Sequence, residues 1–96
     1  MSKYSLSKLP SETLKNTASK HRELRKKAKL SQAELADRSG VSLGSIKRFE
    51  TTGQISLESF LKLLLILDRL DDFDAILTPI EKMDNIEQLF SNKTRR

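Results

Sequence analysis

Residues 25–50 contain two short helical patterns separated by one tight turn, and this feature constrains the fold more than any other part of the chain. Ser31 is a good N-cap, and Glu34 stands three residues later, so the two form a capping box that predicts the start of a helix. Gly40 should end this helix, because glycine adopts the left-handed conformation of a C-terminal cap without steric penalty.

A second short helix is predicted directly after the turn. Ser42 can cap its N-terminus, while Ile46 and Phe49 stand three residues apart and should face inward. Two short helices joined by a turn of three to four residues are typical of a helix-turn-helix motif.

The motif resembles the Cro/cI-repressor (XRE) helix-turn-helix family over approximately residues 20–77. Three segments carry the resemblance, in order and without gaps: Gln32-Ala33-Glu34-Leu35-Ala36, Gly40-Val41-Ser42 and Ser45-Ile46-Lys47-Arg48-Phe49-Glu50. The resemblance implies an all-α, five-helix lambda-repressor-like DNA-binding domain. It also implies a sequence-specific, dimeric transcriptional regulator that binds double-stranded DNA at a near-palindromic operator.

The second helix of such a motif normally places its N-terminal residues on base edges in the major groove. Lys47 is the best candidate for a guanine contact, and Leu43 for a thymine methyl group. Gly44 departs from the polar residue common at its position in the family, and it allows close backbone approach. The resemblance makes Gln32 a phosphate ligand that braces the recognition helix. The full predicted DNA-binding set is Ser31, Gln32, Ser42, Leu43, Gly44, Ser45, Lys47 and Arg48.

The resemblance also assigns a structural salt bridge. In the family, an arginine of the first helix pairs with a glutamate that closes the recognition helix, and Arg25 and Glu50 occupy these positions. We expect a partly buried pair with a structural role.

The composition argues against an enzyme and against a membrane protein. The chain has no cysteine, and its single histidine, His21, is interpreted as an inert surface residue. Asp71, Asp72 and Asp74 are explained by helix capping and solvation, so no catalytic residue, metal site or cofactor is predicted. The longest mainly apolar stretch, residues 60–67, is too short to span a bilayer, which needs about 20 residues. A cytoplasmic protein is therefore expected.

The charge of the chain is unevenly distributed. Residues 1–56 hold 12 Lys/Arg and 5 Asp/Glu, for a net charge of +7, whereas residues 57–96 hold 6 and 8, for a net charge of −2. Lys26, Lys27 and Lys29 on their own are explained by a solvated surface, but beside a helix-turn-helix they favour phosphate contact. The asymmetry predicts one surface for a polyanion and another surface for a different partner.

Three further helices are predicted around the motif, within a domain of residues 11–77 that follows a flexible arm of residues 1–10. Ser11 should cap a first helix that runs to about Lys29 and places Leu24 and Ala28 in the core. Ser56 should cap a fourth helix, from Leu57 to about Asp68. A fifth helix is expected over residues 71–77.

The fourth predicted helix is apolar almost all round, so it must be buried on more than one side. We assign one face to the domain core, through Leu57, Phe60, Leu64 and Leu67. A second copy of the chain is the economical cover for the remaining apolar side chains. The predicted dimer interface consists of Leu61, Leu65, Leu70, Phe73 and Ile76.

The C-terminal segment, residues 78–96, is predicted to contain an extra amphipathic helix followed by a basic tail. Thr78-Pro79-Ile80-Glu81 is a helix-start pattern. Together with residues 56–60 and 70–74, this segment resembles small HipB-like antitoxins, which autoregulate operons that encode HipA-type kinase toxins. The alternatives are a stand-alone phage-type or chromosomal repressor, and a protein-interaction module without DNA binding. Gln32, Lys47 and Arg48 argue against the interaction module.

Overall fold

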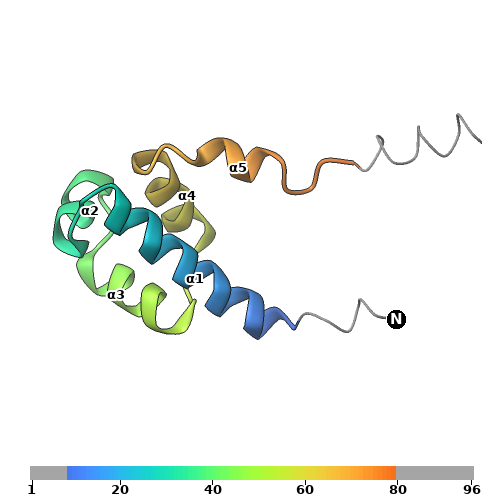
Figure 1. Ribbon diagram of the computed structural model, residues 1–96, viewed down its shortest axis with the longest axis horizontal. Helices are drawn as coiled ribbons and strands as arrows, with labels where there is room; N and C mark the ends of the chain where they lie inside the picture. The colour runs from blue at the N-terminus through green and yellow to red at the C-terminus, as the bar shows by residue number, and fades with distance from the viewer. Residues whose placement is uncertain (1–8, 80–96) are drawn as a thin grey trace, which may run out of the picture.

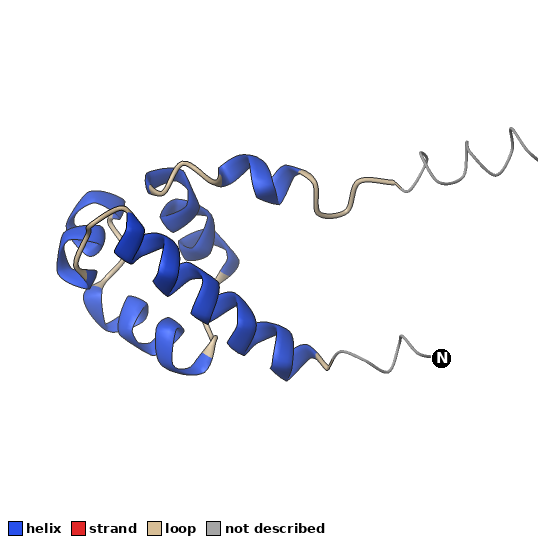
Figure 2. Ribbon diagram, viewed as in Figure 1, coloured by secondary structure: helices blue, strands red, loops and turns tan. Residues whose placement is uncertain are grey.

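A computed structural model describes residues 9–79, and within this range the chain forms five α-helices and no strand (Figures 1 and 2). The all-α fold predicted from the sequence is confirmed. The predicted N-terminal arm and the predicted C-terminal helix lie almost entirely outside the described residues. The helices are α1 (Pro10–Lys27), α2 (Gln32–Ser39), α3 (Leu43–Thr52), α4 (Leu57–Ile66) and α5 (Leu70–Asp74).

Helix α1 begins and ends earlier than the sequence pattern suggested. Pro10 occupies the first turn and Leu9 is the N-cap residue, so the prediction that Ser11 caps the helix is wrong. Proline suits this position because its fixed φ angle is already helical and its missing N–H has no helical partner there. The helix ends at Lys27, and Lys29 takes a φ of 61° in the turn that follows. Ala28 therefore lies exposed in this turn and does not join the core as predicted.

The ends of α2 and the start of α3 match the local signals. The Ser31 hydroxyl accepts a hydrogen bond from the Glu34 backbone N–H at 3.0 Å, and the Ser31 N–H donates to the Glu34 carboxylate at 2.7 Å. Gly40 has a φ of 81° and closes α2. The Ser42 hydroxyl accepts from the Ser45 N–H at 3.1 Å and caps α3.

Gly53 ends α3 at the point where the helix approaches α1. Its φ is 85°, and a Cβ atom at this position would lie 2.7 Å from backbone atoms of Leu14. The crossing of α1 and α3 therefore requires both the left-handed conformation and the absence of a side chain.

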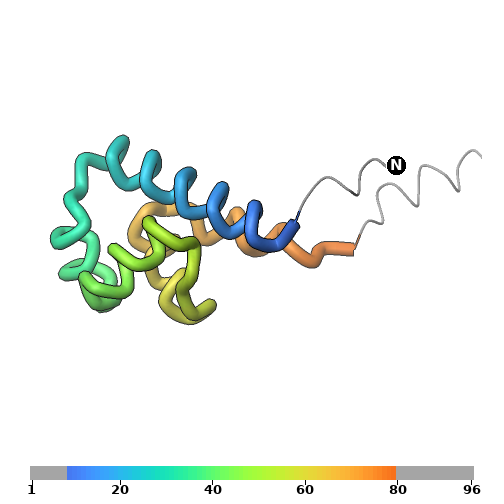
Figure 3. The backbone as a smooth tube through the Cα atoms, turned by 90° about the horizontal axis from the view of Figure 1, so that it is seen from below, coloured from blue at the N-terminus to red at the C-terminus, as the bar shows by residue number. Residues whose placement is uncertain are grey.

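The core lies where α1, α2, α3 and α4 meet (Figure 3). The largest fully buried side chains are Leu35, Ile46, Phe49 and Leu63. Two assignments on α4 differ from the prediction: Leu57 is 57% exposed, and Leu63 is completely buried. Leu57 lies in the first turn of α4, at the edge of the domain, where it borders a surface groove together with Leu14. Leu63 instead faces the α2–α3 core.

Helix α5 is attached to the domain through aromatic contacts. The ring of Phe60 lies 5.6 Å from that of Phe49 and 6.5 Å from that of Phe73, both in edge-on geometry, which is favourable for aromatic pairs. The helix is shorter than predicted and ends at Asp74. Residues 75–77 form a turn, and the Thr78 hydroxyl donates to the backbone carbonyl of Asp74 at 3.2 Å. None of the helices in residues 9–79 is long and apolar enough to cross a membrane.

Candidate nucleic-acid interface

Helix α3 presents a polar face to solvent on the side opposite its buried residues. Ile46 and Phe49 are buried in the core, whereas Gly44, Lys47 and Arg48 are exposed. These three exposed residues lie three and four positions apart, so they share one face of the helix. The sequence predicts DNA contacts for all three residues, and the structure leaves them accessible to a partner.

The N-terminal turn of α3 is already engaged in capping. The Ser42 hydroxyl donates to the Ser45 hydroxyl at 2.9 Å and also accepts from the Ser45 N–H. Ser42 is exposed, while Leu43 and Ser45 are half-buried. Both serine hydroxyls therefore take part in the cap of α3.

Arg48 is oriented by a residue that the sequence analysis did not single out. Its guanidinium donates to the Gln54 side-chain oxygen at 2.8 Å. Both residues border a polar hollow of about 320 Å³ beside the N-terminus of α4, which is lined by Ser45, Arg48, Gln54, Ile55, Ser56 and Ser59. No local pattern marks Gln54, because its role depends on the turn that follows α3.

The Glu50 carboxylate joins three helices beneath the exposed face of α3. The Arg25 guanidinium of α1 donates to both carboxylate oxygens at 2.9 Å. The Gln32 side-chain amide at the start of α2 donates to Oε1, also at 2.9 Å. Arg25 further donates to the Leu30 carbonyl oxygen at 3.0 Å. The pair expected between Arg25 and Glu50 therefore forms, and Gln32 is bonded to the same carboxylate.

His21 is part of this cluster, so its interpretation as a surface histidine is wrong. Its side chain is 2% exposed, and Nδ1 lies 2.8 Å from Oε2 of Glu50. The imidazole ring also packs against Phe49, with ring centroids 4.9 Å apart. His21 stands one helical turn before Arg25, so the spacing of the two residues was the signal that they share the face of α1 packed against α3.

The pKa values of this cluster define its charge state at neutral pH. Burial lowers the pKa of His21 below its ordinary value, and the charge of Arg25 adds to this, against the opposing effect of Glu50. Burial by itself raises the pKa of Glu50, but hydrogen bonds from Arg25 and Gln32 and the charges of Arg25 and His21 lower it overall. Glu50 is therefore ionised and His21 neutral. The proton of the neutral ring belongs on Nδ1, which faces the carboxylate.

The predicted dimer residues differ in their accessibility. Leu65 is 61% exposed, and Leu70 and Ile76 are also exposed. Leu61 and Phe73 are half-buried. Part of the Phe73 side chain is covered within its own domain, because its ring packs on Phe60.

The chain matches a known protein family. A helix-turn-helix family model covers residues 22–73, which is more than half of the chain. The chain therefore belongs to the Cro/C1-type helix-turn-helix (XRE) family, which is a family of DNA-binding regulatory domains and not of enzymes. No curated protein and no solved structure gives a significant match. In residues 9–79, no three potential metal-ligating side chains of His, Cys, Asp or Glu lie together.

Proposed function

We propose that the protein is a transcriptional repressor that binds a near-palindromic operator as a homodimer. The observation that carries this proposal is the exposed face of α3 formed by Gly44, Lys47 and Arg48, on a helix whose opposite face is locked into the core. A rigidly held helix with accessible cationic side chains is the element that reads base edges in a major groove.

Within this proposal, Lys47 contacts a guanine and Leu43 contacts a thymine methyl group. Gly44 allows the backbone to approach the groove closely. Ser42 and Ser45 lie at the N-terminus of α3, where short polar side chains reach either bases or phosphates.

Phosphate contacts are assigned to Ser31, Gln32 and Arg48. Gln32 stands at the N-terminus of α2, where the helix dipole favours an anion. Its bond to Glu50 supports the assignment, because the bond connects this phosphate site to the recognition helix. The bond from Arg48 to Gln54 supports a fixed orientation of the guanidinium. Such contacts set the register of the protein on DNA and carry no base information.

Dimerisation is supported by the apolar side chains around α4 and α5 that the described part of the fold leaves exposed. Leu65, Leu70 and Ile76 would be covered by the same residues of a second copy, as in a two-fold interface. Two copies would place two recognition helices about 34 Å apart, one turn of DNA.

We further propose that this repressor is the antitoxin of a HipA-type kinase toxin and regulates its own operon. Two features support this finer proposal. The first is the resemblance of the chain to HipB-like antitoxins. The second is the position of the acidic helix α5, whose Phe73 packs through Phe60 on the buried side of α3 at Phe49, away from the exposed cationic side chains of α3. With this arrangement, a protein partner near α5 need not compete with DNA at α3.

The test is a pull-down of the tagged full-length chain from its native cells, with and without nuclease, followed by sequencing of the bound DNA. Recovery of a discrete operator supports the repressor, and a kinase-like protein retained after nuclease supports the antitoxin. Recovery of an operator without such a protein would indicate a stand-alone repressor. Recovery of protein partners without DNA would instead indicate an interaction module and overturn the proposal.

A further inference from the structure

We propose that His21 is a positioning residue for DNA recognition: its neutral ring steadies the Glu50 carboxylate under α3, and its protonation weakens DNA binding. The inference rests on the proposed DNA binding by α3 and adds to it a control by pH. Its basis is the arrangement of His21, Arg25 and Gln32 around one buried carboxylate.

His21 approaches a carboxylate oxygen that one other side chain also contacts. Nδ1 of His21 and Nε of Arg25 both lie within 2.9 Å of Oε2 of Glu50, while Gln32 and the outer nitrogen of Arg25 bind Oε1. The side chains of His21 and Glu50 are 2% and 4% exposed. A change in the charge of the ring therefore acts directly on the group that joins α1, α2 and α3.

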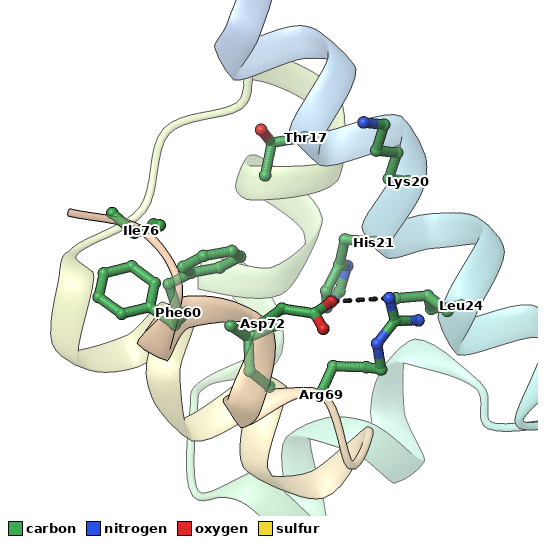
Figure 4. A pocket seen from close by; sticks show the side chains of 10 residues that line it. Thr17, Lys20, His21, Leu24, Phe60, Arg69, Asp72 and Ile76 are labelled. Atoms are coloured by element: carbon green, nitrogen blue, oxygen red, sulfur yellow. Dashed lines mark ion pairs between the residues drawn. The ribbon is translucent and has the colours of Figure 1, made fainter. Parts of the chain in front are cut away.

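The net charge of the cluster is zero only while His21 is neutral. Arg25 and Glu50 cancel each other, and Gln32 carries no charge. On the open side, His21 borders a cavity of about 260 Å³ whose charged lining residues are Lys20, Arg69 and Asp72 (Figure 4). Arg69 and Asp72 pair with each other at 2.7 Å. Protonation would thus add a positive charge beside Arg25 with no unpaired anion among the described residues around it.

Burial of Nε2, the second ring nitrogen of His21, raises the free-energy cost of protonating the ring. Both His21 nitrogens are buried. Nδ1 makes a close contact with Oε2 of Glu50 at 2.8 Å, outside regular hydrogen-bond geometry, and within residues 9–79 Nε2 has no hydrogen-bond partner. A protonated ring carries an N–H on each nitrogen, so Nε2 would become a buried donor without an acceptor. We expect the cluster to relax by hydration from the cavity, which loosens the contacts of Glu50.

A displacement of Glu50 would be transmitted to the DNA-contacting residues. Glu50 lies three residues after Lys47 and two after Arg48 on the same helix. The geometry of α3 that binds DNA therefore requires a neutral His21 ring. At low pH, where the free protein carries a protonated ring, DNA binding must release that proton. Release of a single proton limits the change in affinity to about tenfold per pH unit.

The test uses the full-length protein and a duplex operator fragment selected from random DNA. Dissociation constants are measured by fluorescence anisotropy from pH 7.5 to 5.5 at constant ionic strength. His21 is the only histidine, and the α-amino group titrates near 7.7–8.0, so a transition below pH 6.5 would report this ring. The parent should bind more weakly as pH falls. A protein of net charge +5 without such a switch should bind DNA unchanged or more tightly.

Two variants separate positioning from simple core packing. His21→Asn keeps an amide donor near the position of Nδ1 that cannot titrate, so it should bind like the parent at pH 7.5 and lose the pH dependence. His21→Leu removes the donor and should bind roughly three- to tenfold more weakly at pH 7.5. Tight binding by His21→Leu at pH 7.5, or equal pH profiles in the parent and His21→Asn, would overturn the inference.

A second readout does not depend on DNA or on folding of the variants. In an NMR titration of the parent, the His21 ring and the backbone amides of Lys47 and Arg48 should shift with one common midpoint below 6.5. Amides of α3 that do not move while the ring titrates would also overturn the inference. If the parent selects no DNA, the proposed function fails, and the NMR titration still tests whether His21 controls the geometry of α3.

Discussion

Arg25 and Glu50 stand twenty-five residues apart and form a bidentate ion pair, with both N–O distances at 2.9 Å. Their side chains are 9% and 4% exposed. The pair connects α1 to the end of the recognition helix, and Gln32 adds the start of α2. Local sequence patterns place the two residues on separate helices, and the fold brings them into contact.

Arg25→Ala should destabilise the domain strongly. Removal of one partner leaves the Glu50 carboxylate buried without its cation, and the expected loss is about 3–5 kcal/mol in the free energy of unfolding. Lys62→Ala is the matched control, because Lys62 pairs with Glu58 at 3.6 Å on the exposed surface. The control should change stability by less than about 1 kcal/mol. Urea unfolding followed by circular dichroism measures both, and equal losses would show that the buried pair has no special role.

Lys47→Ala should weaken binding to the selected operator by about 1–3 kcal/mol and relax specificity at one base pair. Lys15→Ala removes the same charge from an exposed position on α1 and serves as the control. Anisotropy titrations with the operator and with point variants of it distinguish the two effects. If Lys47→Ala bound the operator as tightly as the parent, Lys47 would not be a base-reading residue.

Gly53→Ala should cost more stability than Gly40→Ala, although the two glycines have similar φ angles of 85° and 81°. At Gly40 a Cβ atom meets nothing within 4 Å, so only the strain of the left-handed conformation remains, about 1 kcal/mol. At Gly53 the Cβ atom would lie 2.7 Å from the Leu14 backbone, which adds about 1–3 kcal/mol of overpacking. Thermal unfolding of the two variants gives the difference directly, and similar losses would contradict the close crossing of α1 and α3.

Acid should destabilise the domain in two stages. Since the folded pKa of His21 is lowered, its contribution is fully present above pH 6.5 and is lost as pH falls toward the folded value. The folded pKa of Glu50 is also lowered, so its contribution is present above pH 4.5 and is lost through its folded value. Melting temperatures measured across this range should show both stages in the parent. His21→Asn should lack the first stage and keep the second, and a first stage that persists in this variant would assign it to another group.

Leu65→Lys should weaken the proposed dimer with little effect on the folded domain, because Leu65 is 61% exposed. Leu57→Lys is a suitable control, since Leu57 is 57% exposed on the same helix and is not part of the proposed interface. Sedimentation equilibrium at micromolar concentration measures the monomer fraction. Dimerisation that is unchanged in Leu65→Lys would exclude this face as the interface. A parent protein that is monomeric at this concentration would contradict the proposed dimer itself.

The sequence by itself determined the features that depend on neighbouring residues. The capping box of Ser31 and Glu34, the stop at Gly40 and the cap at Ser42 each involve groups within a few positions of one another. Such contacts form whenever the local backbone is helical, so their patterns can be read without knowledge of the fold. The inward positions of Ile46 and Phe49 follow from helical periodicity in the same way.

The tertiary structure decided which helix faces meet and which side chains of each helix enter the core. His21 is buried because α1 packs against α3, where the ring meets Glu50. Leu63 takes the place predicted for Leu57 because α4 packs against α2 and brings Leu63 into the core cluster. Arg48 meets Gln54 only after the turn at Gly53. These contacts depend on crossing angles and on the phase of one helix relative to another. Periodicity gives the apolar side of a helix, but only packing against the other helices fixes its partners.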